Sequence, residues 1–297
     1  MPKPKSEKTM KTKVETPPPQ TSKLRLSHNR INTWLNCHWR YHLYYNEKLV
    51  PKEERSYQLQ VGDVVHRLLH KWYIGEMDLS QISELDKFVQ NIFPEITEAQ
   101  ALDVAIEATN LFNGYVNQWG VKDPLKFLPG GEVQVELEFP DYILFGRIDA
   151  LARTKDKRLW RVEHKTAARM DSHYLGGLKG GLQGAIYDYL IENTMKEQVQ
   201  GTIYNLLLKT KIPSYHRAYT AINRAAIKRM LQTVDGVYRD IQRGDFYPSS
   251  NCFTYNRECA YRLLCNNDTK AVREQFYTVR ENQKEEVKNG NTEEASA

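Results

Sequence analysis

Residues 146–165, GRIDALARTKDKRLWRVEHK, constrain this chain most, because they form two runs of alternating polarity around a polar turn. The first run carries Asp149, the turn falls at 154–157, and the second run carries Glu163 and Lys165. Successive side chains of a strand point to opposite faces, so Glu163 and Lys165 share one face. We therefore expect a hairpin that brings Asp149 alongside these two residues.

The resulting D-x13-E-x-K spacing can be interpreted in two ways. Two carboxylates and one ammonium at the end of a strand pair supply the oxygen ligands that a hard divalent cation prefers. The same side chains would form an ordinary salt-bridge cluster on a strand face that is open to solvent. The spacing alone leaves both interpretations open, so the rest of the chain has to decide between them.

The chain has 297 residues, 40% of them apolar, which is enough for one large domain or two small ones. Its formal net charge of +5 is mild. Residues 1–25 carry seven Lys or Arg and two Glu, which accounts for the whole excess. The net charge is therefore weak support for a nucleic-acid partner, and any basic binding surface must be local.

The chain has no run of 18 apolar residues, and its N-terminus has Lys and Pro where a signal peptide needs an apolar stretch. We predict a soluble, cytoplasmic protein with no membrane partner. Four cysteines in a chain of this length do not resemble a secreted disulfide scaffold.

Both ends of the chain are predicted to be disordered. Residues 1–22, which include three consecutive prolines, are basic and without periodicity, and residues 280–297 are charged and aperiodic. Between them, no linker interrupts residues 23–279, so we predict one continuous domain.

The helical periodicity is strongest in the first half of this domain. Ser27 is a candidate N-cap for a helix that runs through His38 and carries Cys37. A second helix is predicted over 61–72, where His66 falls roughly 100 to 160° from the apolar stripe. A third helix is predicted over 97–119.

The second half alternates strands and helices. The predicted elements are a strand at 132–139, the hairpin described above, a helix at 178–194, strands at 201–209 and 215–221, and a long helix capped by Thr220. The first three strands should form a meander with an acidic face, on which Glu136 is a weaker candidate site residue. The order indicates an α/β core with an added N-terminal helical region and a C-terminal segment that carries cysteines.

Four short motifs occur in a fixed order along the chain, and together they resemble the PD-(D/E)XK nuclease superfamily. The motifs are Gly62-x3-His66, Gly146-x-x-Asp149, Glu163-x-Lys165 and Gln183-x3-Tyr187. The resemblance covers residues 24–266 and is closest to the RecB-like branch, which includes CRISPR-associated adaptation nucleases and phage exonucleases. Ile148 stands where the superfamily often has proline.

The resemblance implies a restriction-endonuclease-like core, with a central mixed sheet flanked by helices. It also implies a metal-dependent DNA nuclease, most simply an exonuclease on single strands or free ends, working in replication, recombination, repair or phage DNA processing. Such a protein would work in a bacterial or phage-infected cell. No G-x4-GK[ST] motif occurs in the chain, so unwinding would need a helicase or recombination partner.

By the same resemblance, Asp149 and Glu163 would ligate Mg2+ or Mn2+, together with the backbone carbonyl of His164. His66 would be a further metal ligand, and Lys165 would orient or deprotonate the attacking water.

Gln183 and Tyr187 lie one helical turn apart. The resemblance places them against the DNA strand or behind Lys165, whereas the residues alone are equally consistent with an ordinary helical Gln and a core Tyr.

The cysteines form a second group, with Cys252, Cys259 and Cys265 spaced C-x6-C-x5-C and Cys37 near the other end of the domain. The resemblance implies that the four thiolates bind a [4Fe-4S] cluster that joins the two ends of the chain. A Zn2+ site or free buried cysteines remain open alternatives, since the more usual triplet begins C-x2-C.

Two rival functions belong to other classes. The first is a catalytically inactive nucleic-acid-binding accessory protein, and the second is a zinc-stabilised interaction module. The presence of Asp149, Glu163 and Lys165 together favours the nuclease over the inactive accessory protein.

Overall fold

The computed structural model describes residues 23–52, 56–77, 84–120, 122–178, 181–254 and 257–280. The predicted disordered segments 1–22 and 280–297 lie outside these ranges, except for Arg280. Within the described ranges no helix is long and apolar enough to cross a membrane.

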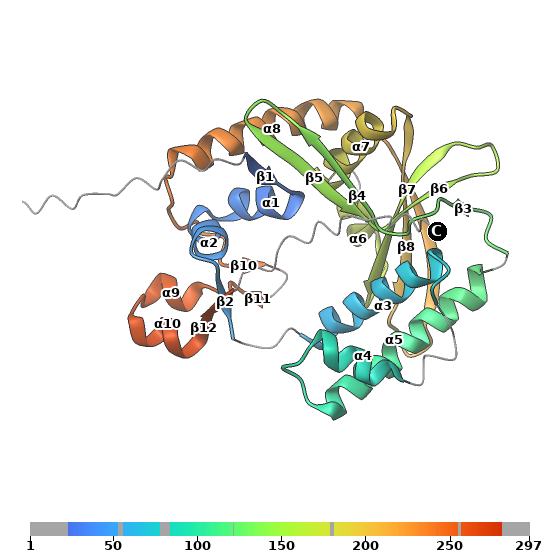
Figure 1. Ribbon diagram of the computed structural model, residues 1–297, viewed down its shortest axis with the longest axis horizontal. Helices are drawn as coiled ribbons and strands as arrows, with labels where there is room; N and C mark the ends of the chain where they lie inside the picture. The colour runs from blue at the N-terminus through green and yellow to red at the C-terminus, as the bar shows by residue number, and fades with distance from the viewer. Residues whose placement is uncertain are drawn as a thin grey trace, which may run out of the picture.

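The centre of the molecule is a five-stranded sheet in the order β3-β6-β7-β8-β9 (Figure 1). The strands are β3 (Lys126–Phe127), β6 (Ala150–Arg153), β7 (Leu159–Ala167), β8 (Val199–Leu208) and β9 (Ser214–Ala221). β7 and β8 are parallel and the other pairs are antiparallel, so the sheet is mixed, as predicted.

A second sheet has three strands in the order β1-β5-β4. They are β1 (Leu24–Leu26), β5 (Tyr142–Ile148) and β4 (Val133–Glu138). The expected single meander is therefore divided, because the chain leaves β5 at Ile148 and enters the five-stranded sheet at Ala150. Asp149 lies at this junction between the two sheets.

The predicted hairpin is confirmed. β6 and β7 pair in antiparallel register from Ala150 opposite Val162 to Arg153 opposite Leu159. In the turn between them Lys157 adopts φ 64° and donates its backbone N–H to the carbonyl of Thr154 at 2.8 Å.

Helices cover both faces of the five-stranded sheet (Figure 1). On one face lie α3 (Tyr57–Tyr73), α4 (Leu85–Ile92) and α5 (Glu98–Trp119), and on the other α6 (Ser172–Leu178) and α7 (Leu182–Met195), which packs against α8 (Arg224–Arg243). Of these, the sequence did not predict α4 and α6. The buried apolar residues form one large cluster around α7 and the three-stranded sheet and another between α3, α4 and α5.

The N-caps test the predicted helix starts. Ser27 accepts a hydrogen bond from the backbone N–H of Arg30 at 3.2 Å and begins α1 (His28–Asn36), as predicted. The predicted cap at Thr220 is wrong, because β9 continues to Ala221 and Asn223 caps α8 instead. Thr220 and Ala221 are still part of the edge strand β9, so the helix begins only after them.

Two segments that are far apart in the sequence meet in a separate region, which we call the cysteine lobe (residues 37–51, 249–254 and 257–280). Its elements are α2 (His38–Tyr41), the π-helix η1 (His42–Asn46), β2 (Leu49–Pro51), β10 (Phe253–Thr254), β11 (Arg257–Glu258), α9 (Arg262–Asn266), α10 (Lys270–Phe276) and β12 (Tyr277–Val279). β2 pairs antiparallel with β12. Cys37 is not within α1 as predicted, since its extended backbone separates α1 from α2.

Candidate active site

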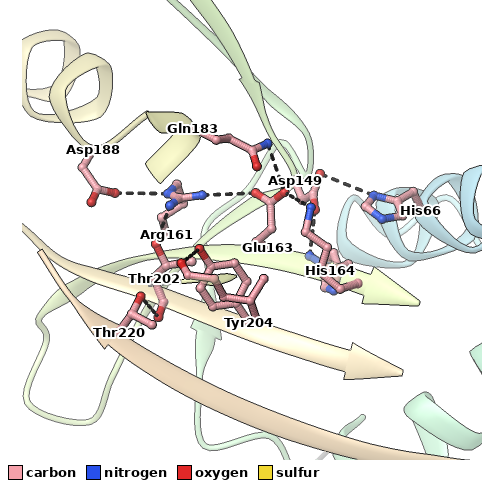
Figure 2. Close-up of polar contacts among 12 residues, drawn as sticks. His66, Asp149, Arg161, Glu163, His164, Gln183, Asp188, Thr202, Tyr204 and Thr220 are labelled. Carbon is pink, nitrogen blue, oxygen red and sulfur yellow. Dashed lines mark hydrogen bonds and ion pairs between the residues drawn. The ribbon is translucent and has the colours of Figure 1, made fainter. Parts of the chain in front are cut away.

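Asp149 stands at the junction of the two sheets and is held from two sides (Figure 2). Its Oδ2 accepts the backbone N–H of His164 from the neighbouring strand β7 at 2.7 Å. Its Oδ1 lies 3.4 Å from Nδ1 of His66 on α3. The strand junction, the central strand and a helix of the covering layer therefore meet at this one carboxylate.

Asp149 and His66 shift each other's protonation. Burial alone would raise the pKa of Asp149, but the charge of His66 and the hydrogen bonds from His66 and the His164 amide hold it well below its usual range. Burial alone would lower the pKa of His66, but the Asp149 carboxylate outweighs it and raises that pKa. The pair thus favours an ionised carboxylate, which is the form that binds cations.

Glu163 and Lys165 lie on the same face of β7, as the alternation predicted. Lys165 Nζ donates to Glu163 Oε1 at 2.6 Å. The charge of Glu163 raises the pKa of Lys165 against the opposing effect of burial, and Asp149 adds to the rise. Lys165 therefore lies within electrostatic reach of both carboxylates, and we call His66, Asp149, Glu163 and Lys165 the carboxylate cluster.

His164 points to the opposite face of β7 and is buried. Its ring stacks on Tyr73 of α3 and its Nδ1 lies 3.2 Å from the Asn205 amide of β8. Burial lowers its pKa to about 3, so the imidazole is neutral. Its side chain therefore takes no direct part in the carboxylate cluster, whereas its backbone N–H does.

Gln183 and Tyr187 of α7 lie behind Glu163. Gln183 Nε2 is 3.4 Å from Glu163 Oε1, and Tyr187 is buried. A Cβ at Gly146 of β5 would lie 2.6 Å from the Tyr187 ring, so only glycine lets the ring take this place. The glycine of the Gly-x-x-Asp motif is thus needed for packing, and its aspartate is Asp149.

A glycine also sets the approach of α3. A Cβ at Gly62 would lie 3.1 Å from Thr166 Oγ1 of β7, which is tighter than an ordinary contact. One turn later along α3, His66 reaches Asp149. The Gly62-x3-His66 motif therefore brings the helix close enough for its histidine to contact the carboxylate cluster.

Several residues near the cluster were missed by sequence reasoning. Arg161 of β7 is 1% exposed and contacts Glu163, Asp188 of α7 and Thr202 of β8 (Figure 2). The alternation places it on the same face as Glu163, but a charged residue in a strand is usually exposed, so the sequence carries no clear signal for its burial. His28 of α1 is a further neighbour, since burial and then the charge of Lys165 lower its pKa.

Two other candidates have contacts of their own. Glu136 pairs with Arg25 at 2.9 Å on the three-stranded sheet. His70, one turn after His66 on α3, accepts the backbone N–H of Glu132 at 2.8 Å through Nδ1.

Within the described ranges, no three His, Cys, Asp or Glu side chains stand arranged to hold a metal ion. At the carboxylate cluster the oxygens contact Lys165, His66 and Arg161 instead. The Lys165 and His66 side chains are 31% and 34% exposed, so both have room to rotate away from the carboxylates. The oxygens that these rotations free are hard donors, and they fit Mg2+ or Mn2+.

The four cysteines are free thiols brought together from both ends of the chain. Cys37 Sγ accepts the backbone N–H of Ser249 at 3.4 Å, and Cys252 Sγ lies 3.7 Å from the Ser249 carbonyl. Burial, and then the neighbouring thiols of Cys259, Cys37 and Cys252, raise the pKa of Cys265 to about 11. The four thiols thus influence one another electrostatically, but among the described residues they are not arranged to hold a metal ion.

A mixed sheet flanked by helices, with an E-x-K pair on its central strand, is the architecture of restriction-endonuclease-like nucleases. The model of the PD-(D/E)XK nuclease superfamily matches residues 25–266, and the chain belongs to this superfamily. No curated protein matches the chain.

Two solved structures are similar at low identity. One is described as a "Putative exonuclease" from Eubacterium rectale, with 14% identity, a TM-score of 0.48, and coverage of 75% of this chain and 83% of that one. The other is described as SSO0001, with 14% identity, a TM-score of 0.27, and coverage of 61% and 88%. The family assignment rests on the family model.

Proposed function

We propose that this protein is a Mg2+- or Mn2+-dependent deoxyribonuclease of the RecB-like branch, acting as an exonuclease on DNA ends or single strands. The observation that carries the proposal is the meeting of Asp149, Glu163 and Lys165 at one strand end in a member of a nuclease superfamily. A surface salt-bridge cluster would not need a carboxylate that is 4% exposed, as Glu163 is.

The carboxylates of Asp149 and Glu163 would hold the cation, with His66 and the backbone carbonyl of His164 as further ligands. A divalent cation supplies an activated water at neutral pH and offsets the charge on the leaving oxygen. The His164 amide keeps Asp149 at a fixed angle to β7, which preorganises the site.

Lys165 has two tasks in this proposal. Its ammonium stabilises the negative charge that develops on the phosphate, and it orients the attacking water. It can do either because its side chain, 31% exposed, can leave Glu163 for the substrate. Gln183 lies next to the same Glu163 oxygen and is placed to support Lys165, while Tyr187 supports the site from behind.

The four cysteines would brace the molecule by binding a [4Fe-4S] cluster, with zinc as the alternative. Support comes from four free thiols in one neighbourhood, drawn from segments more than 200 residues apart in sequence, as the 212-residue separation of Cys37 and Ser249 illustrates. Anaerobically purified protein should then be brown, with absorbance near 400 nm and about four irons per chain. Colourless protein with one zinc would support the zinc site instead.

The substrate is tested with labelled linear and circular DNA, each single- and double-stranded. With Mg2+, an exonuclease shortens the linear forms and leaves the circles intact, and EDTA stops the reaction. Cleavage of circular DNA would show an endonuclease. Binding without any cleavage in Mg2+ or Mn2+ would favour the inactive accessory protein.

A further inference from the structure

Glu163 is held from behind by a buried polar network that none of the four motifs contains. Arg161 donates through Nη1 to Glu163 Oε2 at 3.1 Å and through Nε to Asp188 Oδ1 at 3.1 Å. Its Nη2 donates to Thr202 Oγ1. Each guanidinium nitrogen thus has its own partner, on three different elements (Figure 2).

The network is sealed from water. Arg161, Glu163, Asp188 and Thr202 are 1%, 4%, 6% and 2% exposed. The guanidinium carbon lies 5.4 Å from the centre of the Tyr187 ring, and a Cβ at Gly184 would approach Arg161 Nη2 to 3.3 Å. Burying an arginine and two carboxylates is costly, so the arrangement needs these contacts to be complete.

The two oxygens of Glu163 consequently have different surroundings. Oε2 faces the buried guanidinium, whereas Oε1 faces Lys165 and Gln183 at the accessible side. Without a counter-charge, the positive charge of Arg161 would offset the negative charge of Glu163. The attraction of Oε1 for a cation would then be weaker. Asp188 supplies that counter-charge on the far side of the guanidinium.

We propose that Arg161 and Asp188 form a positioning pair that fixes Glu163 with Oε1 presented for cation binding, and that Thr202 completes it. Arginine suits this task because its planar fork serves three acceptors at once, which the single ammonium of lysine cannot do. This inference rests on the proposed function, because it assigns the cation to Glu163.

The test is to titrate Mn2+ into the DNA-free, full-length protein and to measure binding by isothermal titration calorimetry. Thermal stability is measured in parallel. Asp188→Asn keeps the shape of the side chain and removes its charge, and Arg161→Lys keeps the charge and loses the fork. Each should weaken Mn2+ binding about 10- to 100-fold, the usual effect of losing a partner that orients a metal ligand.

The matched control is Glu197→Gln. Glu197 accepts two hydrogen bonds from Arg153 on β6, at 2.6 and 2.7 Å, so this change also removes the charge from an arginine–carboxylate pair. Because that pair does not touch Glu163, Mn2+ affinity should stay at the wild-type value. Thr202→Val is the milder variant if Asp188→Asn does not fold, and it should weaken binding several-fold.

The variant Asp149→Asn distinguishes failure of this inference from failure of the proposed metal site. If Asp149→Asn loses Mn2+ binding while Asp188→Asn and Thr202→Val bind Mn2+ like wild type and only melt earlier, Arg161 and Asp188 are a structural ion pair and the inference is wrong. If Asp149→Asn and wild type bind Mn2+ equally, the proposed metal site itself is wrong.

Discussion

The carboxylate cluster and the cysteine lobe are both candidate metal regions, but they are stabilised in different ways. Around Glu163, Arg161 and Asp188 connect the central strand to α7, and large apolar cores lie on both sides of the sheet. The cysteine lobe has short elements, and the buried apolar core among its described residues consists of Leu43, Leu49, Tyr261, Leu264 and Tyr277.

This difference indicates what a bound metal would do in each place. The carboxylate cluster is held by Arg161 and by apolar cores on both sides of the sheet, so a cation there would add chemistry rather than structure. The cysteine lobe buries little apolar surface, so a cross-link between its two segments adds stability. Removing metal should therefore stop the reaction at the first region and loosen the second.

The largest effect is expected at the carboxylate cluster. Asp149→Ala and Glu163→Ala should each abolish cleavage of labelled DNA, because each removes a proposed cation ligand. Circular dichroism should show the wild-type fold, and the metal proposed for the cysteine lobe should be retained. Mg2+-dependent cleavage by either variant would remove its residue from the active site.

Cys37→Ser should have the largest effect on stability. A cross-link over a span of this length is worth about 5 kcal/mol in loop-closure entropy. If the thiols hold the proposed cluster, the variant should therefore lose iron and unfold more readily. Hydrogen exchange should speed up in residues 37–51 and 257–280 while β7 stays protected. Equal loss of protection in β7 would show that the two regions are not independent.

His66→Ala should weaken the metal dependence without harming the fold, since His66 lies off the apolar face of α3. The metal concentration for half-maximal cleavage should rise about 10- to 100-fold, and Mn2+, which accepts nitrogen ligands more readily, should rescue more activity than Mg2+. His216→Ala is the control, because this exposed histidine contacts Ser214 on β9. An unchanged metal requirement in His66→Ala would contradict its role as a ligand.

Gly146→Ala should have a moderate effect on both fold and activity. Its Cβ would press on the Tyr187 ring, and such overpacking costs about 1 to 3 kcal/mol. Gly236→Ala on α8 meets nothing within 4 Å and should instead stabilise by up to about 1 kcal/mol. The melting temperature should fall for Gly146→Ala and rise for Gly236→Ala. A shift in the same direction for both variants would contradict the packing argument.

The sequence predicted the hairpin of β6 and β7 because alternation and turn residues are local signals. It also predicted that Glu163 and Lys165 share a face, which their 2.6 Å contact confirms. Ser27 as an N-cap was predictable for the same reason.

The network behind Glu163 was not predictable, because its members are distant in sequence. Arg161 and Asp188 are 27 residues apart, and Arg161 and Thr202 are 41 apart. Only the parallel pairing of β7 with β8 and the packing of α7 bring them together. The break at Asp149 was missed because β5 and β6 continue one alternating pattern across two sheets.

The most direct measurement is the rate of DNA hydrolysis by EDTA-treated wild type and Lys165→Met as Mg2+ is added back. We predict no cleavage before addition, recovery of the wild type with Mg2+, and a rate about 10²- to 10⁴-fold lower for Lys165→Met at every concentration. Cleavage in EDTA, or equal rates for the two proteins, would contradict a cation-dependent centre built on Asp149, Glu163 and Lys165.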